Sequence, residues 1–215
     1  MKRKTIPDDK QLFIFDMDGT ILDSMPMWAT IASDYLESYD IPHDDDVNKL
    51  IEAYTLENAA KYFIELGLDK TVGEIIKEIY DFSFNKYKNE IPAKPGMTEL
   101  LKKLHENGET IILLSASPVQ CAEAAFKRLN ILEYFDKLFS CQDFETDKTV
   151  PETFVNVASS LGFKPENTIV YEDALYSILS AKKAGCKTVA IYDDFAKNEW
   201  DEILKNTDEI LIKPS

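Results

Sequence analysis

Two aspartates separated by one residue stand at the end of the first strongly apolar segment of the chain. Asp16 is the last residue of the run Gln11–Asp16, and Asp18 lies two residues further on. Gly19 and Thr20 follow Asp18 directly. Side chains two apart on an extended segment point to the same side, so both carboxylates can face one pocket. Such a pair can do nucleophilic or acid–base chemistry. The simpler alternative is a strand that ends in a polar turn, with aspartate capping the next segment.

A second candidate site follows the apolar run Thr110–Leu114. The next residues are Ser115, Ala116, Ser117 and Pro118. A hydroxyl at a strand end, followed by a helix with proline in its first turn, suits phosphate binding through hydroxyl and backbone N–H groups. The alternative for Ser117 is an ordinary helix cap, and we expect it to serve that role.

Lysine and acidic residues complete the set of candidates. Lys148 precedes a helical pattern that starts near Pro151, and Glu172 and Asp173 end the apolar run Thr168–Tyr171. A lone lysine is usually a solvated surface residue, so Lys148 is a candidate only because of its position in order among the other candidate segments. Carboxylate oxygens are the ligands that a hard cation such as Mg²⁺ prefers, and Asp173 is the expected direct ligand.

Taken in order, these four segments resemble the motifs of the haloacid dehalogenase superfamily, in its subfamily I with a helical cap, which includes β-phosphoglucomutases and phosphoglycolate phosphatases. The resemblance spans about Leu12 to Ile191. Two positions depart from the family pattern, Thr149 in place of a common proline and Ser177 in place of a common glycine. Neither departure removes a candidate catalytic or metal-binding residue.

The resemblance implies a role for each residue. Asp16 is the expected nucleophile, which becomes phosphorylated, and Asp18 is the expected general acid and base. Ser115, Ala116 and Lys148 are the expected phosphate-binding residues. Thr20 and Glu172 are expected to support the site. One Mg²⁺ is expected as cofactor, held by Asp16, by the backbone carbonyl of Asp18 and by Asp173.

Three functions remain open at this point. The first is a phosphatase that hydrolyses a small phosphorylated metabolite, and the second is a phosphomutase of the β-phosphoglucomutase type. Those mutases carry histidine shortly after the first motif, where this chain has Trp28, so hydrolysis is favoured. A non-catalytic binding protein is disfavoured because Asp16, Asp18, Lys148 and Asp173 are all present. Asp18 also argues against a dehalogenase, whose halide leaving group needs no proton.

The elements that must position these residues are short apolar runs alternating with amphipathic stretches. The runs are the length of buried strands, and the stretches between most of them carry one apolar face. This alternation predicts an α/β fold whose core is a Rossmann-like, doubly wound parallel sheet. The expected strands are Gln11–Asp16, Thr110–Leu114, Lys137–Ser140, Thr168–Tyr171, Thr188–Ile191 and Glu209–Ile212.

One segment interrupts the alternation. Residues 24–91 have helical periodicity throughout, and the proline-rich stretch 91–96 returns the chain to the sheet. We therefore expect an inserted all-helical cap at 24–91, with the catalytic core formed by 1–23 and 92–215. An insertion after the first strand lies near the carboxyl end of the sheet, where ligands bind in open α/β folds.

Composition limits the possible partners and location. The chain has 215 residues and a net charge of −15, from 39 acidic and 24 basic residues. No basic stripe is available to neutralise a nucleic acid, and the apolar runs are too short to cross a membrane. The three cysteines suggest neither a disulfide framework nor a zinc site, and the N-terminus shows no signal-peptide pattern. A cytoplasmic monomer acting on a small phosphorylated metabolite is expected.

Overall fold

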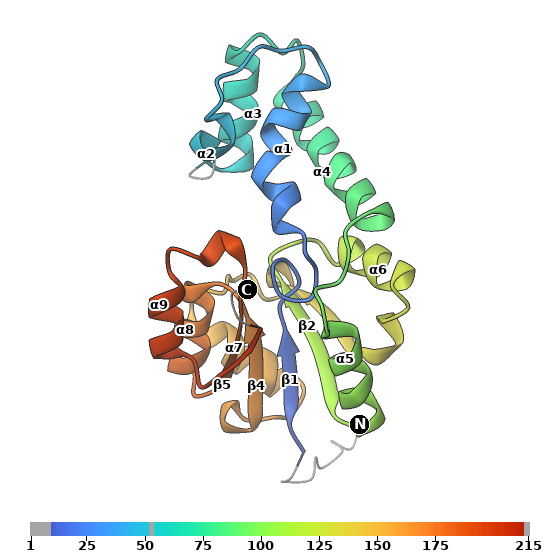
Figure 1. The fold of residues 1–215 in the computed structure, drawn as a ribbon, viewed down its shortest axis with the longest axis vertical. Helices are drawn as coiled ribbons and strands as arrows, with labels where there is room; N and C mark the ends of the chain where they lie inside the picture. The colour runs from blue at the N-terminus through green and yellow to red at the C-terminus, as the bar shows by residue number, and fades with distance from the viewer. Residues whose placement is uncertain (1–9, 52–53, 213–215) are drawn as a thin grey trace. The chain divides into compact units, whose positions relative to one another are not determined.

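The computed structural model describes residues 10–51 and 54–212, and its centre is a six-stranded sheet (Figure 1). The strand order is β3-β2-β1-β4-β5-β6, and every pairing between neighbours is parallel. This order reverses direction at β1, as in doubly wound sheets. The predicted α/β fold class is confirmed. The strands are β1 (Leu12–Phe15), β2 (Thr110–Ser115), β3 (Lys137–Ser140), β4 (Thr168–Glu172), β5 (Lys187–Ile191) and β6 (Glu209–Ile212).

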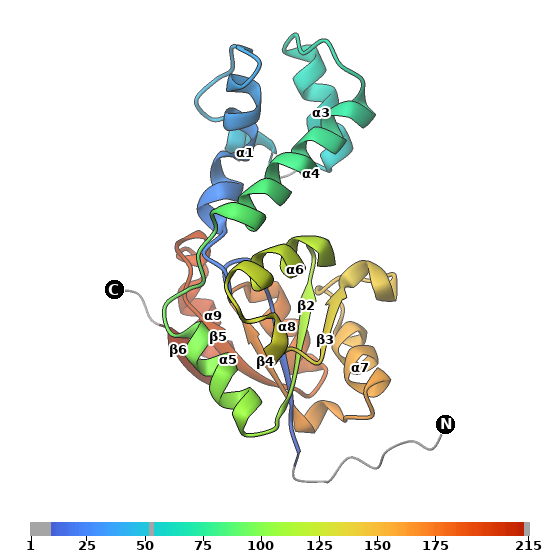
Figure 2. The same cartoon turned by 90° about the vertical axis from the view of Figure 1, so that its right-hand side faces the viewer.

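Helices cover both faces of this sheet. Figures 1 and 2 show α5 and α6 on the opposite side of the sheet from α8 and α9. Right-handed crossovers between parallel strands produce this division, because the chain moves outward from β1 first in one direction and then in the other. The helices of this unit are α5 (Met97–Glu106), α6 (Val119–Arg128), α7 (Pro151–Ser160), α8 (Leu175–Lys183) and α9 (Trp200–Asn206).

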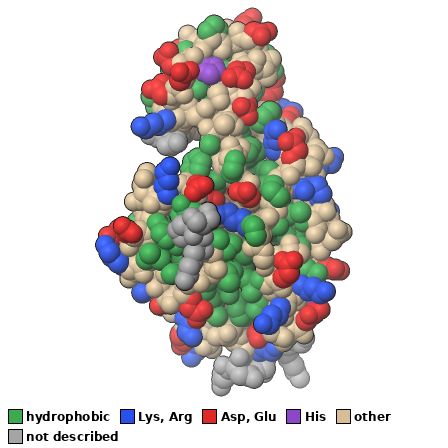
Figure 3. Space-filling model, in the orientation of Figure 1, with side chains coloured by type: hydrophobic (Ala, Val, Ile, Leu, Met, Phe, Trp, Pro, Cys, Tyr) green, Lys and Arg blue, Asp and Glu red, His purple; other side chains and the backbone are tan. Residues whose placement is uncertain are grey.

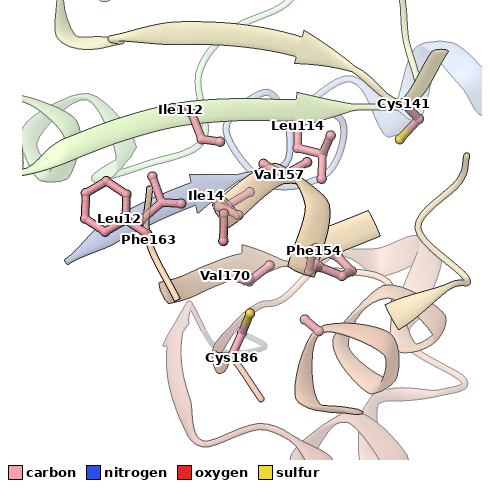
Figure 4. Close-up of a cluster of buried hydrophobic side chains, with 12 residues drawn as sticks. Leu12, Ile14, Ile112, Leu114, Cys141, Phe154, Val157, Phe163, Val170 and Cys186 are labelled. Carbon is pink, nitrogen blue, oxygen red and sulfur yellow. The ribbon is translucent and has the colours of Figure 1, made fainter. Parts of the chain in front are cut away.

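The central strands are buried on both faces, which explains their uninterrupted apolar sequence. All four residues of β1 are buried. Alternate residues of a strand point to one face, and Leu12 and Ile14 turn toward Phe154 and Val157 of α7 (Figure 4). Side chains of β2 and β4 join the same cluster. Packing on both faces therefore holds the carboxyl end of β1 in place.

The chain divides into two compact units, Met1–Asp23 with Pro92–Ser215, and Ser24–Ile91. The second unit contains α1 (Met25–Glu37), α2 (Val47–Ile51), α3 (Leu56–Glu65) and α4 (Val72–Asn89). Its own core includes Tyr35, Leu36, Phe63 and Ile75. The start of α4 is stabilised by a capping box between Thr71 and Glu74.

Two short backbone segments of the first unit pair where the helical unit leaves and rejoins it. Leu22 and Ala93 form an antiparallel bridge, and the Asp23 N–H donates to the Pro92 carbonyl at 3.0 Å. The Lys94 N–H adds a bond to the carbonyl of Ile21 at 2.8 Å. These bonds hold the two connections side by side.

The Lys94 side chain is buried and ion-paired. Its Nζ lies 2.6 Å from Oδ2 of Asp193 and 2.8 Å from the Tyr192 carbonyl. The two charged side chains are only 7% and 6% exposed. Asp193 also accepts a hydrogen bond from the Phe195 N–H, so its second oxygen is used as well. Neither Lys94 nor Asp193 belongs to one of the four sequence motifs.

Charged groups are spread over the surface, and the cysteines are inside. On the face shown in Figure 3, acidic and basic side chains are interspersed over the sheet-forming unit, and acidic side chains predominate over the helical unit. Cys121, Cys141 and Cys186 are free thiols, and all three are buried. The segment before residue 10, for which the sequence predicts no leader, lies outside the described residues.

Candidate active site

Three carboxylates meet at the carboxyl edge of the sheet. Asp16 follows β1, and its N–H donates to the Tyr171 carbonyl of β4 at 3.0 Å. This bond continues the ladder between the two strands, so the ends of β1 and β4 stay in register. Asp16, Glu172 and Asp173 each offer a carboxylate oxygen, and these oxygens lie within 4.8 Å of one another. All three residues are buried.

Lys148 is the cation that faces this cluster. Its Nζ donates to Oε1 of Glu172 at 2.7 Å and also donates to Oδ1 of Asp16. The lysine is only 5% exposed, so the alternative of a solvated surface lysine is excluded. Burial alone would lower the pKa of Lys148, but the charges of Asp16 and Glu172 hold that pKa above its ordinary value.

One ammonium does not balance three carboxylates. Burial raises the pKa of Asp16 to about 7, with Lys148 opposing the shift and Glu172 and Asp18 adding to it. Burial also raises the pKa of Asp173, and the charges of Glu172 and Asp16 contribute. The cluster therefore has more acidic than basic groups, and all of them are buried. Its oxygens are the donors that Mg²⁺ prefers, so the residues present fit a divalent cation.

Glu172 uses both of its oxygens within the protein. Oε1 accepts from Lys148, and Oε2 accepts from the backbone N–H groups of Asp173 and Ala174, at 3.0 and 3.1 Å. These bonds fix the turn between β4 and α8 and orient Lys148. Such a geometry suits a residue that organises the site more than one that binds the cation directly.

The turn after Asp18 holds Asp173 in place. Thr20 donates from Oγ1 to Oδ1 of Asp173 at 3.0 Å. Gly19 has φ +83°, and a Cβ at this position would overlap the carboxylate of Asp173. Glycine is therefore required for two reasons, the left-handed backbone and the close approach of a carboxylate.

The segment after β2 approaches the same edge. The Ser117 N–H donates to Oγ of Ser115 at 3.0 Å, and the Ser117 hydroxyl donates to Oδ2 of Asp18 at 2.7 Å. The expectation that Ser117 caps a helix is wrong. The N-cap of α6 is Pro118, which has no side-chain capping bond. The Ser117 hydroxyl instead donates its hydrogen bond to the carboxylate of Asp18, which is 99 residues away in the chain. Ala116 lies between the two serines and is exposed.

One residue near the site has no counterpart in the sequence prediction. Burial of the Tyr176 hydroxyl raises its pKa to about 12, and the charge of Glu172 adds to the shift. The side chain as a whole is half exposed, and the charges of Asp16 and Asp173 also act to raise the pKa of its hydroxyl. Its position three residues after Asp173, in the first turn of α8, is the signal that could have identified it.

In the helical unit, Trp28 is part of an apolar cavity. The indole Nε1 donates to the Tyr87 hydroxyl at 3.0 Å. Trp28 and Tyr54 line a cavity of about 260 Å³ together with Ile31, Ile51, Phe63 and other apolar residues. Lys86, on α4 of the same unit, is paired with Glu90 at 2.8 Å.

Comparison with known proteins gives consistent relatives. The chain is 27% identical over 204 residues to validoxylamine A 7′-phosphate phosphatase of Streptomyces hygroscopicus subsp. limoneus, covering 92% of this chain and 94% of that protein. It is 24% identical to a phosphorylated carbohydrates phosphatase of Thermotoga maritima, covering 82% of each. The structure of a β-phosphoglucomutase from Clostridium difficile superposes with a TM-score of 0.68 at 23% identity, covering 94% of this chain and 90% of that one.

Within residues 10–51 and 54–212, no helix combines the length and apolar character that a membrane crossing needs.

A family match spans most of the sheet-forming unit and the insertion. Residues 13–191 match the family model that is described as haloacid dehalogenase-like hydrolase. This range contains all four motifs, so the resemblance inferred from them is confirmed. The chain belongs to the haloacid dehalogenase-like hydrolase family.

Proposed function

We propose that this protein is a Mg²⁺-dependent phosphatase that hydrolyses a small phosphorylated metabolite through a phosphorylated Asp16. The observation that carries the proposal is the buried cluster of Asp16, Glu172 and Asp173 at the sheet edge, in which Lys148 is paired with Asp16 and Glu172. A buried carboxylate beside an ammonium is a nucleophile placed where a phosphoryl group can be neutralised. Structural requirements of the fold alone do not explain this concentration of charge, because burying charged groups is costly.

In the first step, an oxygen of Asp16 bonds to phosphorus while the bond from phosphorus to the leaving oxygen breaks. Asp18 gives its proton to that leaving oxygen. In the second step, a water oxygen bonds to phosphorus, and the bond to Asp16 breaks. Asp18 takes a proton from the water, so the enzyme returns to its starting state with inorganic phosphate released.

Other residues bind the phosphoryl group and keep it in place. Lys148 offers its ammonium to the phosphoryl oxygens, while Ser115 offers a hydroxyl and Ala116 a backbone N–H. Asp16, the backbone carbonyl of Asp18 and Asp173 would hold Mg²⁺. When bound, the cation supplies positive charge that offsets the substrate phosphate and the carboxylates.

The substrate proposed is a phosphorylated carbohydrate or a similar small metabolite. The named activities of the relatives support this class, since both act on phosphorylated carbohydrates or related compounds by name. Hydrolysis is preferred over the mutase reaction because Trp28 occupies the position where histidine is expected in mutases. Its indole is already bonded to Tyr87 in the helical unit. A cytoplasmic monomer that binds neither nucleic acid nor membrane remains a prediction.

The proposal is tested with p-nitrophenyl phosphate and a panel of sugar phosphates, each with and without Mg²⁺. Turnover should require the cation and should disappear with a chelator. Asp16→Asn should lower kcat by about a thousandfold or more, since it removes the nucleophile while retaining its shape. A folded Asp16→Asn protein that retains turnover would contradict the assignment, and transfer of phosphate between sugar hydroxyls would favour the mutase.

A further inference from the structure

We infer that Ser117 is a positioning residue for Asp18, a role that rests on the proposed function of Asp18 as general acid and base. The Ser117 hydroxyl donates to Oδ2 of Asp18 at 2.7 Å. It joins the loop after β2 to the loop after β1, and these two strands pair in parallel along all four residues of β1. The contact is thus built on the rigid centre of the sheet.

The backbone around Ser117 is restrained on both sides. Its N–H donates to Oγ of Ser115, the expected phosphate ligand, at 3.0 Å. Pro118 follows with φ −59°, and a proline restricts the residue before it to extended conformations. Ser117 is therefore held by one bond and by its neighbour's ring. A donor fixed in this way can orient the carboxylate that accepts its hydrogen bond.

The hydroxyl also determines which oxygen of Asp18 is used for proton transfer. The hydroxyl that donates to Oδ2 occupies one of the two lone pairs of that oxygen, so we assign the transferable proton to Oδ1, which Ser117 does not contact. The same arrangement serves both half-reactions. In the first, Oδ1 gives its proton to the leaving oxygen. In the second, Oδ1 receives a proton from water. Ser117 exchanges no proton in either step.

One residue thereby links phosphate binding to acid–base chemistry. Through its N–H, Ser117 orients the Ser115 oxygen, which leaves the Ser115 hydrogen to be donated to phosphate. Through its hydroxyl, it orients Asp18. Loss of the side chain should affect only the second of these contacts, because the N–H is retained in any variant other than proline.

The test uses two substrates of nearly equal shape whose leaving groups differ in basicity. Phenyl phosphate needs a proton on its leaving oxygen more than p-nitrophenyl phosphate does. In Ser117→Ala, kcat/KM should fall about tenfold or more for phenyl phosphate and less than about threefold for p-nitrophenyl phosphate. Ser117→Thr keeps a hydroxyl and should stay within about threefold of the wild type for both. Ser117→Cys, which nearly retains the size but donates weakly, should behave like alanine.

Asp18→Asn separates failure of this inference from failure of the proposed function. If Asp18→Asn shows the leaving-group-dependent loss and the folded Ser117→Ala and Ser117→Cys proteins do not, the role of Ser117 is overturned while that of Asp18 stands. If Asp18→Asn loses no activity on either substrate, the general acid itself is wrongly assigned. Equal losses on both substrates in Ser117→Ala also overturn the inference, because they indicate a structural defect. Circular dichroism and melting temperature establish that each variant is folded.

Discussion

At the scale of single residues, the site is defined by an imbalance of charge. Three carboxylates are buried together, only two of them are paired with the ammonium of Lys148, and burial raises the pKa values of Asp16 and Asp173. Glu172 uses its oxygens on Lys148 and on backbone N–H groups. The two aspartates therefore remain as the acidic groups whose charge a cation would offset.

This imbalance predicts how the metal-free protein responds to pH. The folded pKa of Asp16 is about 7, against an ordinary value of 3.8, so the folded state holds a proton that the unfolded state releases. The stability associated with that proton is complete below about pH 4 and is lost as pH rises toward 7. The metal-free protein should melt at a lower temperature at pH 8 than at pH 5, and Mg²⁺ should raise the melting temperature at pH 8.

Asp16→Asn provides the control for this experiment. The amide cannot ionise, so its melting temperature should depend less on pH in the same range and should exceed that of the metal-free wild type at pH 8. Equal pH dependence in the two proteins would show that Asp16 is not the group responsible.

At the scale of elements, the candidate site residues come from the carboxyl ends of β1, β2 and β4 and from the loop before α7. Parallel pairing places these strand ends along one edge, and the turns decide how the side chains meet. The turn at Gly19 shows this dependence. It brings the backbone against Asp173 so closely that no side chain fits between them.

Replacing Gly19 with alanine should therefore damage the proposed cation site. The new methyl group would displace the Asp173 carboxylate and strain a backbone with φ +83°. We expect apparent Mg²⁺ affinity, measured by titrating activity, to fall about 10- to 100-fold. Gly73→Ala is a matched control, since Gly73 lies in α4 with no atom within 4 Å of its added Cβ. That variant should keep its activity and gain up to about 1 kcal/mol of stability.

At the scale of the whole molecule, contacts between residues distant in sequence hold the segments of the first unit together. The Lys94–Asp193 pair joins the segment that re-enters this unit to the loop after β5. Both side chains are buried, so each depends on the other for charge compensation.

Lys94→Met should destabilise the protein strongly because it leaves Asp193 buried without its ion-pair partner. The expected loss is roughly 3 to 5 kcal/mol in the free energy of unfolding, measured by urea denaturation. The double variant Lys94→Met, Asp193→Asn should recover part of this loss, because no uncompensated charge remains. A double variant less stable than the sum of both single changes would contradict this explanation.

The sequence was sufficient to predict what depends on local pattern and on the strand ends. Runs such as Thr110–Leu114 are strands because they are buried on both faces, and burial requires continuous apolar sequence. It was insufficient where a local preference competes with a distant partner. Ser117 is a good capping residue by type, yet Asp18 takes its hydroxyl. The Lys94–Asp193 pair spans 99 residues and follows no spacing rule.

The bridge between Leu22 and Ala93 has a consequence for how the chain is threaded. The two ends of the 68-residue helical unit, Ser24–Ile91, are attached to neighbouring backbone positions joined by the Asp23–Pro92 hydrogen bond. The two connecting segments therefore pair like the strands of an antiparallel hairpin, and the entire helical unit is the loop between them. Lengthening such a loop costs only about 0.6 kcal/mol per doubling. The insertion point can accept segments of very different size, or a short reverse turn, without changing the register of any strand.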